Sequence, residues 1–441
     1  MTKNNRPILM LLVLFLAAAA VLPTFAAPRT PSAPKGKYVT VTPVDITAND
    51  LLYDPARDVV YASVPSSGGA TGNSIVRITP DGGVGEALFV GSEPNVMALS
   101  ANGAYLYVGI DGAGAFRRVA LADDSIGPLW PLGSDGCGST LRATDMVGLL
   151  GEPQAVAVAR AGQCGYDTVA VYDNGAMRPE TLPAYMGLRS LEPSGVPGAL
   201  FGYSYGAGYD EFYVLATSAE GITRTMTLPG LVTGFADIHY ANGFVYATRG
   251  QVVDAASLTL AGTYAAQGPL AVDSAAGAIA FVEADFFTSS PHLKVFDLDT
   301  FLPLFSAPLP PLVNEMATPL ELLAVGDAFF MRQRDGRVML WRLVEQSAVS
   351  GRVTNQHGSG IQGVVISDGA GHTATTDWDG YYTLAPLPDG THTLTPSFDG
   401  YNYIFDPPSI AVTVPPDVAG QDFRASPVPT QWGVWLPLVR R

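Results

Sequence analysis

The sequence predicts an all-β protein with two unequal parts. A pattern of strand, small turn and strand in residues 51–64 returns at 96–110, 236–248 and 268–284. Gly and Pro are abundant, with 48 and 35 copies, as expected where many short strands need many turns. No apolar stripe at the spacing i, i+3 and i+4 of a helix runs between the repeats. We therefore expect a long repeat region of strands, followed by a smaller β domain.

Residues 1–27 have the pattern of a secretory signal peptide. Lys3 and Arg6 precede an apolar core, and small residues favour cleavage after Ala26. An uncleaved anchor is the alternative, but the apolar core is shorter than the about 20 residues of a membrane span. We expect an exported protein, secreted or at the bacterial cell surface, with a Pro-rich linker at 28–36 and no transmembrane span after signal removal. The net charge of −16 argues against a nucleic-acid partner.

The repeats predict a β-propeller over residues 37–345. Strand-turn-strand units between 44 and 345 recur about every 43 residues, the length of a four-stranded propeller blade. Their centres lie near Tyr53, Met97, Val156, Phe201, Ile238, Val272 and Leu323. This spacing favours seven blades and leaves six or eight open. A strand at 38–42 has no neighbour in sequence, so we expect it to pair with 337–343 and close the ring.

The repeats resemble seven-bladed propellers of the lactonase-like and surface-layer type, through LYV at 106–108 and KVFDLDT at 294–300. Some lactonase-like propellers hold a metal through carboxylates and Asn, so the resemblance leaves Ca²⁺ in the central channel open, although the sequence identifies no cofactor or metal ligand. Aspartates in propellers more often cap turns. The acidic residues at repeat positions are Asp237, Asp273, Glu283, Asp285, Asp297 and Asp299.

Residues 348–425 predict a small antiparallel β-sandwich, with short strands and a tight turn at Asp379-Gly380. They resemble the carboxypeptidase regulatory-like domain, a seven-stranded, prealbumin-like sandwich. The matching positions are Gly351, Val353, Gly363, Val365, Thr376, Asp377, Gly380, Tyr382, Leu384, Leu387, Gly390, Leu394, Gly400 and Tyr401. The resemblance implies a non-catalytic accessory domain. No His in the chain is followed three residues later by Glu, so a zinc-peptidase motif is not found.

Few residues are candidates for a site. Cys137 and Cys164 are the two cysteines, and in an exported protein they predict a disulfide. Tyr203, Tyr205 and Tyr209 lie in a dense aromatic run and are candidate ligand contacts, for example by stacking on sugar rings. Period-two alternation favours the alternative that this run is a strand pair with aromatic core positions. We interpret the five His as surface or strand residues, and Asp377 to Gly380 as a turn rather than a calcium loop.

Residues 426–441 form a C-terminal tail. Its end, VWLPLVRR, resembles a short terminal sequence of exported proteins of one bacterial phylum, which implies sorting or surface attachment. The alternative is a last edge strand packed on the sandwich. The sequence as a whole predicts a non-catalytic binding or scaffold protein at the cell surface, with an extracellular protein or carbohydrate as partner. A metal-dependent propeller enzyme, either a lactonase or a glycan hydrolase or lyase, is the alternative, although no catalytic motif is found.

Overall fold

The computed structural model describes residues 37–183, 186–206, 209–284, 291–309, 318–345, 347–399 and 403–428. The predicted signal peptide, the linker and the tail beyond residue 428 lie outside the described residues. Contacts within the chain divide its described residues into one compact unit at Lys37–Glu345 and a second between residues 347 and 428. In the described part of the chain, no helix is long and apolar enough to cross a membrane.

The first unit contains seven separate sheets in its described residues. The first sheet contains β2 (Asp50–Asp54), β3 (Val59–Val64), β4 (Ser74–Ile78) and β5 (Val84–Phe89), and the second contains β6 (Pro94–Leu99), β7 (Tyr105–Ile110), β8 (Ala115–Ala120) and β10 (Trp130–Pro131), with β9 (Ser125–Ile126) also paired with β8. The third sheet contains β11 (Arg142–Gly148), β12 (Ala155–Gly162), β13 (Gly165–Asp173) and β14 (Ala176–Met177). The fourth contains β15 (Ser190–Pro193), β16 (Ala199–Gly206), β17 (Tyr209–Ser218) and β18 (Gly221–Pro229). The fifth sheet contains β19 (Ile238–Ala241), β20 (Phe244–Ala247), β21 (Gln251–Asp254) and β22 (Thr259–Thr263). The sixth contains β23 (Leu270–Asp273), β24 (Ala278–Glu283), β25 (His292–Asp297) and β26 (Pro303–Pro308). The seventh contains β27 (Pro319–Val325), β28 (Ala328–Gln333), β29 (Arg337–Glu345) and β1 (Lys37–Thr47). Two short 3-10 turns, η1 (Gly69–Thr71) and η2 (Asp111–Ala113), connect strands.

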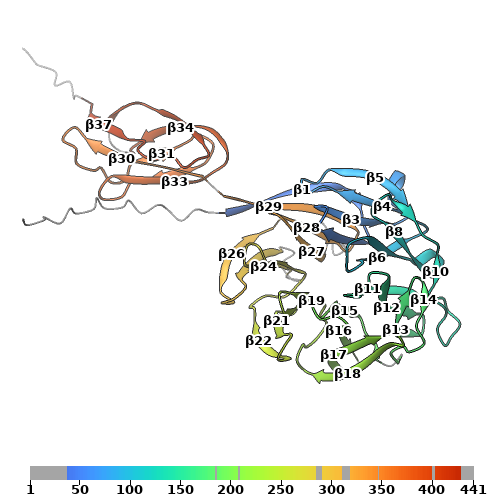
Figure 1. Ribbon diagram of the computed structural model, residues 1–441. Helices are drawn as coiled ribbons and strands as arrows, with labels where there is room; N and C mark the ends of the chain where they lie inside the picture. The colour runs from blue at the N-terminus through green and yellow to red at the C-terminus, as the bar shows by residue number, and fades with distance from the viewer. Residues whose placement is uncertain are drawn as a thin grey trace, which may run out of the picture. The chain divides into compact units, whose positions relative to one another are not determined.

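The sheets are arranged as a β-propeller. Each sheet presents its first strand towards the middle of a ring and its last strand outwards (Figure 1). The first strands contact one another, as in the pairs β2 with β6, β6 with β11 and β11 with β15. Strand β27 contacts both β23 and β2, so the last sheet lies beside the first. The predicted all-β fold with radial repeats is confirmed.

The two ends of the propeller sequence pair with each other. Strand β1 runs antiparallel to β29, from Lys37 opposite Glu345 to Thr47 opposite Arg337, with a shift in register between Val44 and Thr47. Val44 and Ile46 of β1 are buried in a cluster that also contains residues of β28 and β3. Radial closure protects sheet edges that would otherwise be exposed. The prediction that the strand at 38–42 closes the ring is confirmed.

The core of the propeller is divided among the interfaces between neighbouring sheets. One buried cluster joins the last sheet to the first, and another joins Tyr61 and Ile75 of the first sheet to Leu106 and Val119 of the second. Aromatic rings fill the next interface, where Phe116 lies 4.9 Å from Tyr172 between ring centroids. Each sheet is thus buried on both faces, which explains why second strands such as β3 and β7 are apolar at most positions.

The second unit is a β-sandwich of two four-stranded sheets. One is ordered β33 (Tyr381–Leu387), β30 (Ser347–Asn355), β37 (Phe423–Pro427) and β35 (Tyr403–Asp406); the other is β32 (Thr373–Thr375), β31 (Val365–Ser367), β34 (Gly390–Ser397) and β36 (Ile410–Val414). The eight described strands exceed by one the seven that the resemblance implies, and β30 pairs with β37 in parallel rather than antiparallel. Inward side chains from both sheets form one core.

Candidate functional site in the propeller channel

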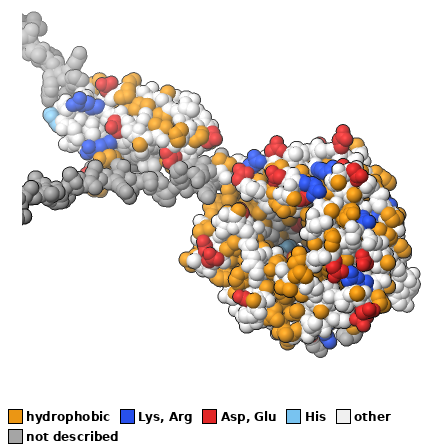
Figure 2. All heavy atoms as spheres, in the orientation of Figure 1, with side chains coloured by type: hydrophobic (Ala, Val, Ile, Leu, Met, Phe, Trp, Pro, Cys, Tyr) orange, Lys and Arg blue, Asp and Glu red, His pale blue; other side chains and the backbone are white. Residues whose placement is uncertain are grey.

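The first strands of the sheets carry acidic side chains into the middle of the ring. Figure 2 shows a hollow there. Four of these side chains, which we call the channel carboxylates, are Asp50, Asp145, Glu192 and Glu321. Each accepts a backbone N–H from the first strand of the next sheet: Asp50 from Met97 at 2.7 Å, Asp145 from Leu191 at 2.6 Å, Glu192 from Tyr240 at 3.1 Å and Glu321 from Leu51 at 3.3 Å. The carboxylates therefore link neighbouring sheets at the centre.

These groups lie on first strands that contact one another around the ring, and they affect one another's pKa. The charge of Asp145 on the third sheet acts on Asp50 of the first sheet, although the second sheet intervenes in the ring. The charge of His239 on the fifth sheet likewise reaches Glu321 on the seventh. The Glu192 and Glu321 side chains are 21% and 19% exposed, so a solute entering the channel can reach them.

Burial makes the charged forms of the channel carboxylates costly. Burial first, and then the negative charge of Asp237, raise the pKa of Asp145 to about 8. Burial raises the pKa of Glu192 well above its usual value, and Asp145 adds to the rise. The pKa values of Asp50 and Glu321 are also raised, chiefly by burial. A cation in the channel would offset this repulsion and favour the ionised forms.

Two basic side chains share the channel with the carboxylates. The Arg332 Nε donates to Glu321 Oε2 at 2.7 Å, and the positive charge of Arg332 opposes the rise in the pKa of Glu321. His239 lies between two acids, with Nδ1 3.8 Å from Glu192 Oε1 and Nε2 3.9 Å from Asp237 Oδ2. With five acids against two bases, the channel carries excess negative charge once its carboxylates are ionised.

Preformed metal-ligand clusters in the described residues lie elsewhere. Two groups bring three potential ligand atoms within 4.8 Å of one another: Asp135 with Cys137 and Cys164, and Asp368 with His372 and His392. The structure joins Cys137 to Cys164 as a disulfide, which occupies both sulfurs. Ca²⁺ in the channel therefore remains a prediction.

The sequence-predicted acids have several different environments. Asp237 lies at the channel, where it is bonded to Ser190. Asp273 and Asp297 cap turns by accepting backbone N–H groups, as expected for propeller aspartates, and Asp297 also binds the N–H of Asp299. Glu283 forms an ion pair with Lys294. Asp285 lies outside the described residues.

The aromatic candidates are mostly part of the core. Tyr203 is fully buried and its hydroxyl donates to the Gly234 carbonyl at 2.8 Å, so its ring is not available to a ligand. The half-buried Tyr205 has the Arg189 guanidinium 4.6 Å from its ring centroid. Tyr209 begins β17 and pairs with Gly206, but its side chain is outside the description. The alternative of a strand pair with aromatic core positions is confirmed by the β16–β17 hairpin.

The turn at Asp377 to Gly380 is confirmed. Asp377 Oδ1 accepts the N–H groups of Asp379 and Tyr381 at 2.9 and 2.8 Å, and Gly380 has a φ of +81°. These bonds use the carboxylate for the turn itself.

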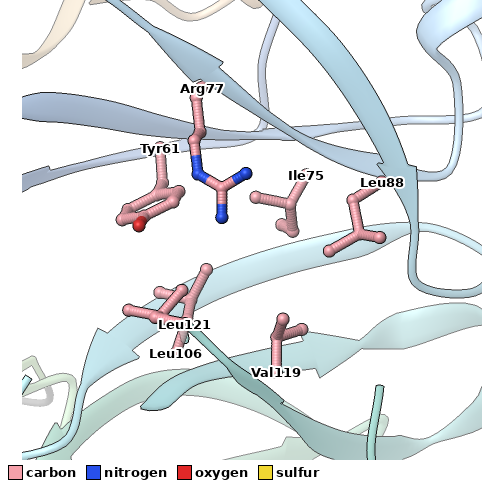
Figure 3. Close-up of a pocket in the computed structure, with 7 residues that line it drawn as sticks. All are labelled: Tyr61, Ile75, Arg77, Leu88, Leu106, Val119 and Leu121. Atoms are coloured by element: carbon pink, nitrogen blue, oxygen red, sulfur yellow. The ribbon is translucent and has the colours of Figure 1, made fainter. Parts of the chain in front are cut away.

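A second opening lies between the first two sheets (Figure 3). Apolar side chains of β4, β5, β7 and β8 surround it, and Arg77 extends into it with the guanidinium 5.6 Å from the centroid of the Tyr61 ring. Arg77 Nη1 donates to Asp124 at 2.9 Å. The opening has room for about one water molecule, so it is a packing gap rather than a ligand site.

Sequence reasoning missed the channel carboxylates because the acids that it considered, residues 237 to 299, all come from the fifth and sixth repeats. The relevant signal is the nearly constant distance along the chain between each acid and the N–H group that it binds in the next repeat. The carboxylates of Asp50, Asp145 and Glu192 bind N–H groups 47, 46 and 48 residues further along the chain. Alignment of the repeats at that offset would have aligned the acids.

The comparisons with known proteins agree with this architecture. Residues 348–423 match the family model of the carboxypeptidase regulatory-like domain. The chain is thus a β-propeller protein with a C-terminal sandwich that matches this domain family. A search of curated proteins finds no match to the chain.

Solved propellers are similar to the first unit in fold. The β-propeller domain of Cps50 (Swd1) from Myceliophteria thermophila has a TM-score of 0.51 at 11% identity, covering 70% of this chain and 100% of its own. Hydrazine synthase of Kuenenia stuttgartiensis has a TM-score of 0.49 at 13% identity, covering 67% and 95%. The WD40 propeller domain of Doa1 has a TM-score of 0.47 at 11% identity, covering 69% and 97%. At these identities, the likeness to Cps50 supports the fold and nothing beyond it.

Proposed function

We propose that this chain is an exported bacterial binding or scaffold protein, whose propeller binds a positively charged group of an extracellular partner at the channel carboxylates. The observation that carries the proposal is the convergence of four partly buried acids, each with a raised pKa, on one hollow. A cationic group placed there would favour the ionised carboxylates, displace their protons and relieve the repulsion among them. Export and surface location rest on the pattern of residues 1–27.

The sandwich would act as an accessory or spacer domain in this proposal. Support comes from the match of residues 348–423 to the regulatory-like domain family. The partner would be a protein with exposed Lys or Arg, or a carbohydrate with a positively charged substituent. The propeller would have seven blades, which the seven described sheets support. Its lactonase-like or surface-layer repeat type would rest on the sequence resemblance at 106–108 and 294–300.

A metal-dependent lactonase or glycan-cleaving enzyme is the second candidate. The same convergence of carboxylates favours it, because acids around a channel can hold a cation that polarises a substrate oxygen. Binding ranks first because each channel carboxylate already accepts a backbone N–H of the next sheet. Those bonds reduce the oxygens that remain for a metal.

Ligand-dependent thermal unfolding of the full chain tests the proposal. Anything that binds only the folded state raises the midpoint by mass action. Spermidine and a Lys-rich peptide should each raise the midpoint of the wild-type propeller, and Glu192→Gln should remove most of the shift. The matched control is Glu86→Gln, which makes the same substitution on the exposed strand β5 and should leave the shift intact.

Two results would reject the binding proposal. One is a shift of equal size in the wild type and Glu192→Gln, and the other is no shift with any cationic compound. Calcium-dependent hydrolysis of a lactone or oligosaccharide, abolished by a chelator and by Glu192→Gln, would establish the enzyme instead.

A further inference from the structure

Two histidines and an aspartate meet at one end of a hairpin in the sandwich. Strand β31 ends at Ser367 and β32 begins at Thr373, and the loop between them has Asp368 at its start and His372 at its end. Strand β34 is paired with β31 on the other side and carries His392. The fold thus brings together residues up to 24 positions apart.

The three side chains converge on one oxygen. Asp368 Oδ2 lies 2.6 Å from His372 Nδ1 and 3.1 Å from His392 Nδ1. The Asp368 side chain is fully buried, and the side chains of His392 and His372 are 10% and 32% exposed. The other carboxylate oxygen, Oδ1, accepts the N–H groups of Ala370 and His372 at 2.8 and 3.1 Å. These bonds orient the carboxylate so that Oδ2 points at both rings.

The hydrogen bonds of His392 determine which of its nitrogens carries a proton. Its Nε2 lies 2.8 Å from the carbonyl oxygen of Pro388, which only accepts, so Nε2 must be the N–H donor. In the neutral ring Nδ1 then has a lone pair, and that lone pair faces the carboxylate of Asp368. Two acceptors this close require a cation between them, either a proton on the ring or a metal ion.

We propose that Asp368, His372 and His392 bind one divalent transition-metal ion such as Zn²⁺, through both Nδ1 atoms and Oδ2. Two imidazoles and one carboxylate match the ligands that Zn²⁺ takes in proteins, whereas Ca²⁺ and Mg²⁺ take oxygen ligands. The Nε2–H bond to a backbone carbonyl is the outer contact that metal-ligating histidines usually make.

The spacing of the cluster suits such an ion. Ligand atoms at ordinary zinc distances in a tetrahedron lie about 3.3 Å apart. The His392 separation of 3.1 Å is close to this value, and the partly exposed His372 has room to move outward. Three protein ligands leave the fourth position to water. The ion would join the β31–β32 loop to β34, and this site is independent of the channel proposal.

Metal binding to the full chain, prepared without a histidine tag and stripped with a chelator, tests the inference. Equilibrium dialysis against ZnCl₂ with elemental analysis should find one Zn²⁺ bound through this site, in the presence of excess Ca²⁺. Asp368→Asn and His392→Gln should each weaken the affinity by more than about tenfold. Asp368→Asn retains an oxygen for the turn, and Gln at 392 retains a donor near Pro388, so both variants should fold.

The matched control is His357→Gln, which removes an exposed imidazole from another turn of the same domain and should bind Zn²⁺ as the wild type does. Nitrogen-15 NMR of labelled histidines should show two Nδ1 resonances shifted by Zn²⁺ while Nε2 of His392 stays protonated. Equal Zn²⁺ binding by the wild type and His392→Gln would overturn the inference. So would unchanged Nδ1 resonances at saturating ZnCl₂, which would assign the contact to a protonated ring.

Discussion

Replacement of Asp145 by Asn should reduce the pH dependence of propeller stability. Burial, followed by the charge of Asp237, raises the pKa of Asp145 to about 8 in the folded protein. In the unfolded chain an aspartate titrates near about 3.9. Between these two values the folded state holds a proton that the unfolded state has lost.

The direction and the size of the change in unfolding free energy with pH follow from this difference in pKa. The contribution of Asp145 to stability is fully present below about pH 4 and is lost as the pH rises to about 8. Within that window the free energy of unfolding falls by about 1.4 kcal/mol per pH unit for one proton. Asn does not titrate, so this part of the slope disappears. The other three channel carboxylates also have raised pKa values and retain a slope of the same sign.

The substitution also alters hydrogen bonding, but without pH dependence. Asp145 accepts the N–H groups of Met146 and Leu191 through its two oxygens, at 2.7 and 2.6 Å. Asn has one carbonyl oxygen and loses one of these bonds, at a cost of about 0.5–1.5 kcal/mol. This cost lowers the free energy of unfolding by the same amount at every pH and leaves its slope with pH unchanged.

Urea unfolding from pH 4.5 to 8, followed by hydrogen exchange and mass spectrometry, distinguishes propeller peptides from those of the sandwich. The matched control is Asp273→Asn, which changes an acid that caps a turn at the end of β23. It should leave the slope unchanged. The reasoning is refuted if Asp145→Asn and the wild type have equal slopes, or if the wild-type propeller gains stability from pH 5 to 8.

Three further predictions concern the propeller framework. Replacing Cys137 and Cys164 together by Ser should lower the free energy of unfolding by about 3–4 kcal/mol, because the bridge closes a loop across 27 positions; an unchanged urea midpoint would contradict this. Ile46→Ala should cost about 2–5 kcal/mol, since Ile46 is 8% exposed and packs where the ring closes; a loss below 1 kcal/mol would exclude a tight closure. Gly221→Ala should cost at least about 1–3 kcal/mol, because Gly221 has a φ of +142° and a Cβ there would overlap the backbone of Glu180; a midpoint equal to the wild type would show that the strand can shift.

The sequence predicted the framework because the framework depends on local patterns. Alternation and turn residues located the strands, and the isolated strand at 38–42 needed a partner, so ring closure could be predicted. The repeat centres near Val156 and Phe201 fall on the second strands β12 and β16 instead of the first. The first strands of those sheets include Asp145 and Glu192, and their polar channel positions interrupt the apolar alternation that the prediction used.

The sites could not be predicted in the same way, because they depend on which strands lie side by side. Asp50 meets the N–H of Met97 only when the second sheet follows the first around the ring. Asp368 and His392 meet across β31 and β34, with two other strands between them in sequence. The five histidines looked scattered for this reason, and the interpretation of all five as surface or strand residues missed the cluster with Asp368.

The hydrogen bonds that link neighbouring sheets at the channel give a reason to assign a binding role to the channel carboxylates. Neutral groups also join neighbouring sheets at the channel: Asn49 Nδ2 donates to the Pro94 carbonyl at 2.8 Å, and the Ile238 N–H donates to Ser190 Oγ at 3.4 Å. Linking the sheets therefore does not require an ionisable acid. Partly buried carboxylates with raised pKa values lower stability at neutral pH, and residues kept at such a cost often serve function.

Asp145→Asn should accordingly combine a flatter pH profile with weaker cation binding. If the variant had the flatter pH profile and still bound spermidine with wild-type affinity, the carboxylate would be a structural link alone, and the channel proposal would lose its main support.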